Sequence, residues 1–185
     1  NIQRGRSASI SSELEDLTAL FIALNNPNQC KYFIDQPMKF LGSTTKYPDI
    51  VIQKTDGVID HLIDVKTDFG WNRNGIYAFC DKWEKAIAAV KGKETSFKRG
   101  LDKKLVSGIF SENLKYHVLV ITRRNSGKQI NKDHSRVMEE LKNVYLYVLS
   151  DGLHPNAYGL HADEKLDSIQ IEYSEIERFL KSIIQ

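Results

Sequence analysis

The sequence from residue 47 to residue 66 reads Tyr47-Pro-Asp-Ile-Val-Ile-Gln-Lys-Thr-Asp-Gly-Val-Ile-Asp-His-Leu-Ile-Asp-Val-Lys66. Two apolar runs, Tyr47 to Gln53 and Ile59 to Lys66, flank a polar segment that contains Asp56 and Gly57. An Asp-Gly pair between apolar runs is a strong signal for a tight hairpin turn. We therefore expect two antiparallel strands joined at this turn.

Alternation along the second strand brings two charged side chains together. Residues two apart on a strand share a face. Asp64 and Lys66 therefore point the same way, while Ile63 and Val65 point to the opposite face and into apolar packing. Asp49 opens the first strand directly after a proline. The hairpin thus predicts two carboxylates and one ammonium group converging beside a hydrophobic sheet.

Two carboxylates held close together repel each other and are costly to bury unless a cation lies beside them. Clustered oxygen ligands suit Mg2+, which keeps several waters and completes its coordination with substrate phosphate. A lysine beside such an ion is suited to orient or deprotonate an attacking water. The residue types therefore point to hydrolysis of a phosphodiester with Mg2+ held by Asp49 and Asp64, and with Mn2+ as a substitute metal. The structural alternative is an ion pair at a strand edge.

The residues Pro48-Asp49 followed by Asp64-Val65-Lys66 resemble the signature of the PD-(D/E)xK nuclease superfamily, to which most type II restriction endonucleases belong. The resemblance implies a restriction-endonuclease-like core, a magnesium-dependent endodeoxyribonuclease activity, and catalytic roles for Asp49, Asp64 and Lys66. Many members also carry a glutamate on the first helix that reaches the metal directly or through water.

The stretch Ser9 to Asn25 supplies a candidate for that glutamate. At about 100° per residue its apolar side chains form one stripe. The members of the stripe are Ile10, Leu14, Leu17, Leu20, Phe21 and Leu24. Glu13 falls inside the stripe and is thus expected to face inward with it, whereas Glu15 points almost directly away. Glu13 is therefore the fourth expected catalytic and metal-binding residue. Two alternatives stay open: Glu13 stabilises only the helix start, or Glu15 reaches the metal instead.

The remaining pattern completes an α/β domain. Further strands are expected at Cys30 to Leu41, interrupted near Pro37, and at Tyr116 to Thr122 and Val144 to Ser150. Further helices are expected at Ile76 to Val90, at Ile130 to Lys142 and at Tyr173 to Ile184. A crossover through a helix joins parallel strands. We therefore expect a central mixed five-stranded sheet flanked by helices on both faces. The whole chain, 1–185, is expected to form a single nuclease domain, with a core at about 9–150 and a C-terminal extension, 151–185, that ends in the last helix.

Charge is distributed unevenly along the chain. The net charge is only +2, but residues 82–128 hold twelve Lys or Arg against four Asp or Glu, whereas residues 139–185 hold four against nine. Phosphate contacts supply most non-specific DNA affinity. The candidate DNA-binding residues are Arg73, Lys82, Lys98, Arg99, Lys103, Lys104, Arg123 and Arg124. For any one of these lysines, a solvated surface position is the competing interpretation.

Length and composition limit the other possibilities. A chain of 185 residues with 41% hydrophobic content buries one good core. It contains no apolar run of membrane-spanning length and no signal-peptide pattern, which predicts a soluble cytoplasmic protein with no membrane partner. The resemblance to restriction enzymes implies a bacterial cytoplasm. Cys30 and Cys80 are far apart, so neither a disulfide framework nor a zinc site is expected.

The core uses most of the chain and leaves no helix-turn-helix, zinc finger or other separate domain to read bases. By its size and its stretch Gly5 to Asn25, the chain is similar to the small catalytic subunit of a heterodimeric type IIS restriction endonuclease. That similarity implies double-stranded DNA as substrate and a larger DNA-recognition subunit as partner. The alternatives are a structure-selective nuclease, such as a homodimeric Holliday-junction resolvase, and a catalytically silent module that binds DNA or protein.

Overall fold

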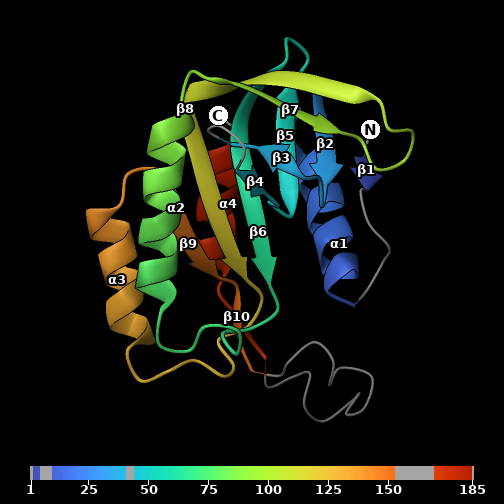
Figure 1. Ribbon diagram of the computed structural model, residues 1–185. Coiled ribbons are helices and arrows are strands. Elements are labelled where there is room, and N and C mark those ends of the chain that lie inside the picture. The colour runs from blue at the N-terminus through green and yellow to red at the C-terminus, as the bar shows by residue number, and fades with distance from the viewer. Residues whose placement is uncertain (1, 5–9, 41–43, 153–168, 185) are drawn as a thin grey trace.

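The computed structural model describes residues 2–4, 10–40, 44–152 and 169–184 as a mixed sheet with helices on both faces (Figure 1). The ends Ser9 and Leu41 of two expected elements, and residues 5–9 of the stretch Gly5 to Asn25, lie outside these ranges. The strands of the main sheet are β1 (Ile2–Arg4), β2 (Cys30–Ile34), β5 (Ile50–Lys54), β6 (Val58–Lys66), β7 (Glu94–Lys98), β8 (Leu105–Val120) and β9 (Val144–Val148). The helices are α1 (Ile10–Asn25), α2 (Ile76–Val90), α3 (Ile130–Glu140) and α4 (Tyr173–Ile183).

The order of the main sheet is β1-β2-β5-β6-β8-β7, and β9 also pairs with β8. Strands β2, β5 and β6 form an antiparallel meander, while β6 with β8 and β8 with β9 are parallel. Two short pairs lie apart: β3 (Met38–Lys39) with β4 (Thr45–Lys46), and β10 (Ser150–Asp151) with β11 (Gln170–Ile171). The expected α/β class and the mixed sheet flanked by helices are confirmed. The five expected strands correspond to β2, β5, β6, β8 and β9, and β1 and β7 extend the sheet beyond them.

The turn between β5 and β6 has the expected chemistry. The N–H of Gly57 donates to the carbonyl of Lys54 (3.0 Å), and the Asp56 carboxylate accepts from the N–H of Val58 (3.0 Å). Gly57 has φ 91°, a conformation that glycine adopts without a Cβ clash. The hairpin therefore brings the start of β5 beside the end of β6, which is where Asp49, Asp64 and Lys66 lie.

Strand β8 begins at Leu105, well before the expected start at Tyr116. Its first part pairs with β7 as an antiparallel hairpin, and its last part lies between β6 and β9. The first part is largely exposed and contains Ser107 and Gly108 instead of an apolar run. Main-chain pairing, more than side-chain burial, holds it in the sheet, which is why the amino-acid pattern gave no signal for it.

Two separate hydrophobic clusters cover the two faces of the sheet. Helices α2 and α3 lie side by side on one face (Figure 1), where Trp83 of α2 stacks on Tyr116 with ring centroids 3.9 Å apart. Helices α1 and α4 cover the other face, where Ile22 and Phe179 pack against Ile63 and other strand residues. Trp83 therefore belongs to the hydrophobic core.

The orientation of α1 differs from the expected one. Ala19 and Ile22 are buried against the sheet, whereas Leu17 is 61% exposed and Leu24 is 76% exposed. Small side chains such as Ala19 allow the helix backbone to lie close to the strands, so the larger leucines are turned outward. The prediction that the leucine stripe enters the core was therefore wrong.

No helix within the described ranges combines the length and the apolar character needed to cross a bilayer.

Candidate active site

Asp49, Asp64 and Lys66 converge as the strand alternation predicted. The ammonium group of Lys66 lies 3.2 Å from the Asp49 carboxylate and 3.2 Å from the Asp64 carboxylate. The Asp49 carboxylate also accepts the backbone N–H of Val65 at 2.7 Å. On the main chain, the carbonyl of Asp49 accepts the N–H of Asp35 at 2.8 Å, so the loop before β5 is fixed to the end of β2.

The electrostatics of this group show an excess of buried negative charge. Burial and the neighbouring Asp64 carboxylate raise the pKa of Asp49 to about 7, although Lys66 and the Val65 N–H oppose the shift. Burial lowers the pKa of Lys66, but the Asp64 and Asp49 carboxylates outweigh burial and raise that pKa overall. One ammonium group therefore stays charged between two carboxylates and only partly compensates them.

Tyr116 of β8 lies next to this group, and no pattern in the sequence indicated this position. Its hydroxyl is buried without a hydrogen-bond partner of ordinary geometry among the described residues. Burial raises the pKa of the Tyr116 phenol well above its usual value, and the nearby Asp64 carboxylate adds to the shift. The phenol therefore stays neutral, with a proton available toward Asp64.

Two loops enclose the group at the end of the sheet. The N–H of Phe69 donates to the carbonyl of Arg124 (3.1 Å), which joins the loop after β6 to the loop after β8. Asn125 donates to the carboxylate of Asp68 across the same junction. Trp71 is 40% exposed, and the Lys66 ammonium lies 5.9 Å from its ring centroid. An aromatic side chain thus borders the open side of the group.

The two candidate glutamates of α1 have the opposite orientations to those expected. Glu13 is exposed, whereas Glu15 is half-buried and its charge contributes to the raised pKa of Asp49. The predicted inward orientation of Glu13 was therefore wrong, because it depended on the leucine stripe facing the core. The burial pattern of Ser12, Ala19 and Ile22 shows which face of α1 meets the sheet, and Glu15 belongs to that side.

The candidate DNA-binding residues fall into three groups. Arg73, Arg123 and Arg124 lie on the loops beside Lys66, and the N–H of Gly127 donates to the carbonyl of Arg73 (3.1 Å). The second group lies on the loop and strand end of the β7–β8 hairpin. Its members are Lys98, Arg99, Lys103 and Lys104.

The hairpin loop contacts the segment after β2, where the N–H of Gly100 donates to Gln36 (3.2 Å). Within the loop, Arg99 is paired with Asp102, which reduces the free positive charge of this group. Lys82 stands apart on an exposed side of α2. The structure thus brings only the first group directly beside the site.

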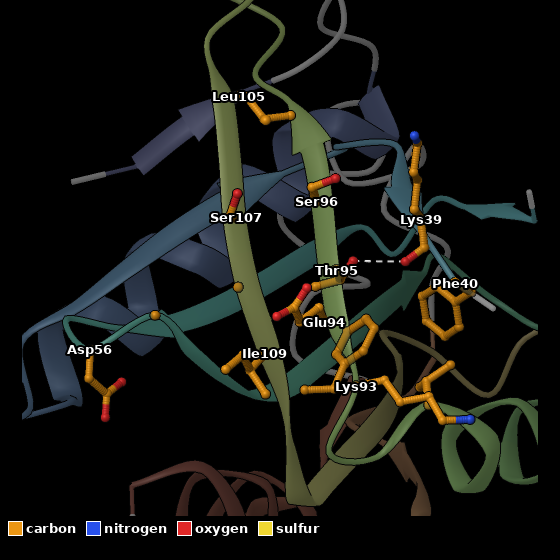
Figure 2. Close-up of a pocket in the computed structure, with 14 residues that line it drawn as sticks. Lys39, Phe40, Asp56, Lys93, Glu94, Thr95, Ser96, Leu105, Ser107 and Ile109 are labelled. Atoms are coloured by element: carbon orange, nitrogen blue, oxygen red, sulfur yellow. Dashed lines mark hydrogen bonds between the residues drawn. The ribbon is translucent and has the colours of Figure 1, made fainter. Parts of the chain in front are cut away.

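A cavity of about 750 Å3, drawn in Figure 2, lies away from this group. Its lining includes Asp56 of the β5–β6 turn, which is at the opposite end of β6 from Lys66, and strand residues such as Ile109 and Thr95. In Figure 2 the Thr95 hydroxyl donates to the carbonyl of Lys39, at 2.8 Å. None of the lining residues belongs to the Asp49 group, so we place the candidate site by its chemistry and not by cavity size.

Among the described residues no three His, Cys, Asp or Glu side chains are grouped closely enough to hold a metal ion. Comparison of the chain with protein-family models, with curated proteins and with solved structures found no match. The candidate site therefore rests on its own residues: two carboxylates, one charged lysine and a neutral phenol at the edge of a sheet.

Proposed function

We propose that this protein is a magnesium-dependent DNA endonuclease of the restriction-endonuclease-like type. The observation that carries the proposal is the convergence of Asp49 and Asp64 on Lys66, each carboxylate 3.2 Å from the ammonium group. Structural ion pairs also perturb pKa values. The distinguishing feature here is the second carboxylate, which leaves the group with excess negative charge and gives Asp49 a pKa of about 7.

The residues present fit a divalent cation. Asp49 and Asp64 would hold it, and Mn2+ would replace Mg2+ because both accept carboxylate oxygens. The absence of a third grouped ligand among the described residues is compatible with Mg2+, which is often bound by one or two carboxylates with water and substrate phosphate in the other positions. When bound, the ion would polarise the phosphoryl oxygen and lower the pKa of a water.

Lys66 acts in this proposal as a charged donor. Its pKa is raised, so the ammonium group keeps its proton at neutral pH and positions the phosphate and the attacking water instead of accepting a proton. Asp49 fixes the lysine and the Val65 N–H in one geometry. Arg123 and Arg124, on the adjoining loop, are the proposed contacts to the DNA backbone. Glu15 replaces Glu13 as the glutamate of α1 nearest to the site.

The proposed substrate is double-stranded DNA, and the proposed source of sequence specificity is a larger recognition subunit. The described residues form one main sheet with its helices and two short strand pairs, and they include no added base-reading domain. We therefore assign this chain the cleavage of one strand within a heterodimeric type IIS restriction endonuclease.

The test is a plasmid-nicking assay with Mg2+, performed with the chain alone and with the product of the neighbouring gene. Nicking at one site only in the mixture supports the proposal. If neither the chain nor the mixture cuts with Mg2+ or Mn2+, the proposal fails. Calorimetry provides an independent reading, because a catalytically silent module binds neither ion.

The same protein preparation separates the heterodimer from a resolvase. A homodimeric resolvase sediments as a dimer and binds branched DNA without a partner. We expect the isolated chain to bind a four-way junction no more tightly than a linear duplex of equal length. A clear preference for the junction would replace the restriction assignment with the resolvase one.

A further inference from the structure

The outward face of α1 is apolar. Leu17, Leu20, Phe21 and Leu24 are all exposed, and Leu24 reaches 76%. They recur three and four residues apart, the spacing at which a helix presents one continuous stripe. Single exposed leucines are ordinary, but a contiguous stripe marks an interaction site because it leaves apolar surface in water. We call these four residues the α1 stripe.

The α1 stripe borders an apolar groove of about 250 Å3 between α1 and α4. The walls include Leu14 and Phe21 from α1 and Ile176 and Phe179 from α4. Leu119 of β8 and Ile121, directly after this strand, also line the groove. Thr18 is the one polar side chain among the residues that line it. A groove between two helices over a sheet has the shape that accepts the apolar side chains of a third helix.

The charge of α1 indicates which kind of helix fits the groove. From Ile10 to Asn25 the helix contains Glu13, Glu15 and Asp16 and no lysine or arginine. A second copy of this helix offers no basic partner in either orientation, and a parallel pairing would bring like charges together, which disfavours a second copy of the chain. A helix with basic residues beside its apolar face would instead be attracted to the acidic first half of α1.

We propose that the α1 stripe and the groove dock an amphipathic helix of a partner protein, one whose apolar anchors are flanked by lysine or arginine. Its leucine-type side chains enter the groove over Ile121, and its basic residues lie along the acidic side of α1. The inference rests on the apolar surface and the charge of α1, and it does not depend on the proposed cleavage chemistry.

The docking surface lies directly behind the candidate active site. The N–H of Ile121 in the groove donates to the carbonyl of Lys66 at 2.8 Å, and Leu119 pairs with Val65 across the strands. A partner bound here therefore contacts the reverse side of the strand end that carries Lys66. This position suits a partner that delivers the chain to its substrate.

The probe is a synthetic helical peptide of about 15 residues with leucine at positions three and four apart and lysine elsewhere. Binding to the full chain is measured by fluorescence anisotropy. We expect the patterned peptide to bind at least about tenfold more tightly than a scrambled peptide of the same composition, and than a peptide with glutamate in place of lysine. Equal binding of the three peptides would overturn the proposal.

Variants locate the binding. Leu17→Glu and Phe21→Glu each place a charge in the α1 stripe. Both positions are exposed, so the fold is retained. Each substitution should abolish the anisotropy change caused by binding of the patterned peptide. The matched control is Leu101→Glu, an 82% exposed position on the β7–β8 loop, which should bind like the unaltered chain. If Leu17→Glu binds normally, the site is elsewhere. If the chain alone forms a dimer that Leu17→Glu dissociates, a second copy is the occupant and the proposal is overturned.

Discussion

His61 and His117 make the stability of this protein sensitive to acid. The Nδ1 of His61 lies 3.1 Å from the Nε2 of His117, and the Nδ1 of His117 lies 3.3 Å from the Tyr147 hydroxyl. That hydroxyl lies 3.0 Å from Ser182, which donates to the carbonyl of Phe179. With both rings neutral, each N–H can point along the chain from His61 toward Ser182. A charged His117 carries a proton on both ring nitrogens, so it could not accept a hydrogen bond from His61.

Burial lowers the pKa of His61 to about 4, and it lowers the pKa of His117 well below its usual value. A folded pKa below the unfolded value of about 6.5 means that stability is complete above pH 6.5 and is lost as the pH falls toward 4. For His61 alone the loss between pH 7.5 and pH 5 is about 2 kcal/mol, since one pKa unit corresponds to about 1.4 kcal/mol.

Urea unfolding at pH 7.5 and at pH 5.0 measures this loss. We expect His61→Gln to be less stable than the unaltered chain at pH 7.5, with a deficit that shrinks by about 2 kcal/mol at pH 5.0. The matched control is Tyr147→Phe, which removes a hydroxyl from the same chain of hydrogen bonds but no group that titrates between these pH values, so it should cost about 1 kcal/mol at both. A deficit for His61→Gln that is the same at both pH values would refute the reasoning.

The remaining predictions concern the carboxylate pair and the turn. The folded pKa of Asp49, about 7, lies above its unfolded value of about 4, so the ionised carboxylate destabilises the fold increasingly as the pH rises from 4 to 7. Asp49→Asn should therefore raise the urea midpoint more at pH 8 than at pH 5. Mg2+ at a hundred times its dissociation constant should stabilise the unaltered chain by about 2.7 kcal/mol in thermal unfolding, and it should leave the stability of Asp64→Asn unchanged. Equal stabilisation of the two proteins by Mg2+ would exclude this metal site. Gly57→Ala should cost about 1 kcal/mol from its positive φ alone, because a Cβ there meets no atom within 4 Å. Gly108→Ala should cost more, because its Cβ would lie 2.9 Å from the Gly57 carbonyl. A lower urea midpoint for Gly57→Ala than for Gly108→Ala would contradict these two expectations.

Strand alternation and turn chemistry predicted the local geometry of Asp64 and Lys66 correctly, because both depend on neighbours in the sequence. The orientation of α1 could not be predicted in this way. Its leucine stripe has the spacing of a core-facing surface, and only the packed structure shows that Ala19 and Ile22 occupy that role. A helix that keeps an apolar face for a partner gives the same pattern as one that buries the face in its own core.

Tyr116 illustrates a second limit. Its place beside Asp64 depends on the parallel register of β6 and β8, in which Leu62 pairs with Tyr116 and Asp64 with Val118. The register of this pairing shifts between Ile59 and His61. Ile59 and Leu62, which are three residues apart, therefore both pack in the hydrophobic cluster that includes α2. Register between distant strands is set by packing and bulges, so it cannot be read from either strand alone.

Replacement of Lys66 is the decisive test of the proposed cleavage site. Strand cleavage of a plasmid is measured with Mg2+, in the presence of the partner if the unaltered chain needs one, for the unaltered chain, Lys66→Ala and Lys85→Ala. Lys85 pairs with Asp81 on the surface of α2, so its removal controls for the loss of one positive charge. We predict that Lys66→Ala loses cleavage by at least about a hundredfold while keeping its fold, and that Lys85→Ala cuts normally. Cleavage by Lys66→Ala at the unaltered rate would contradict the account.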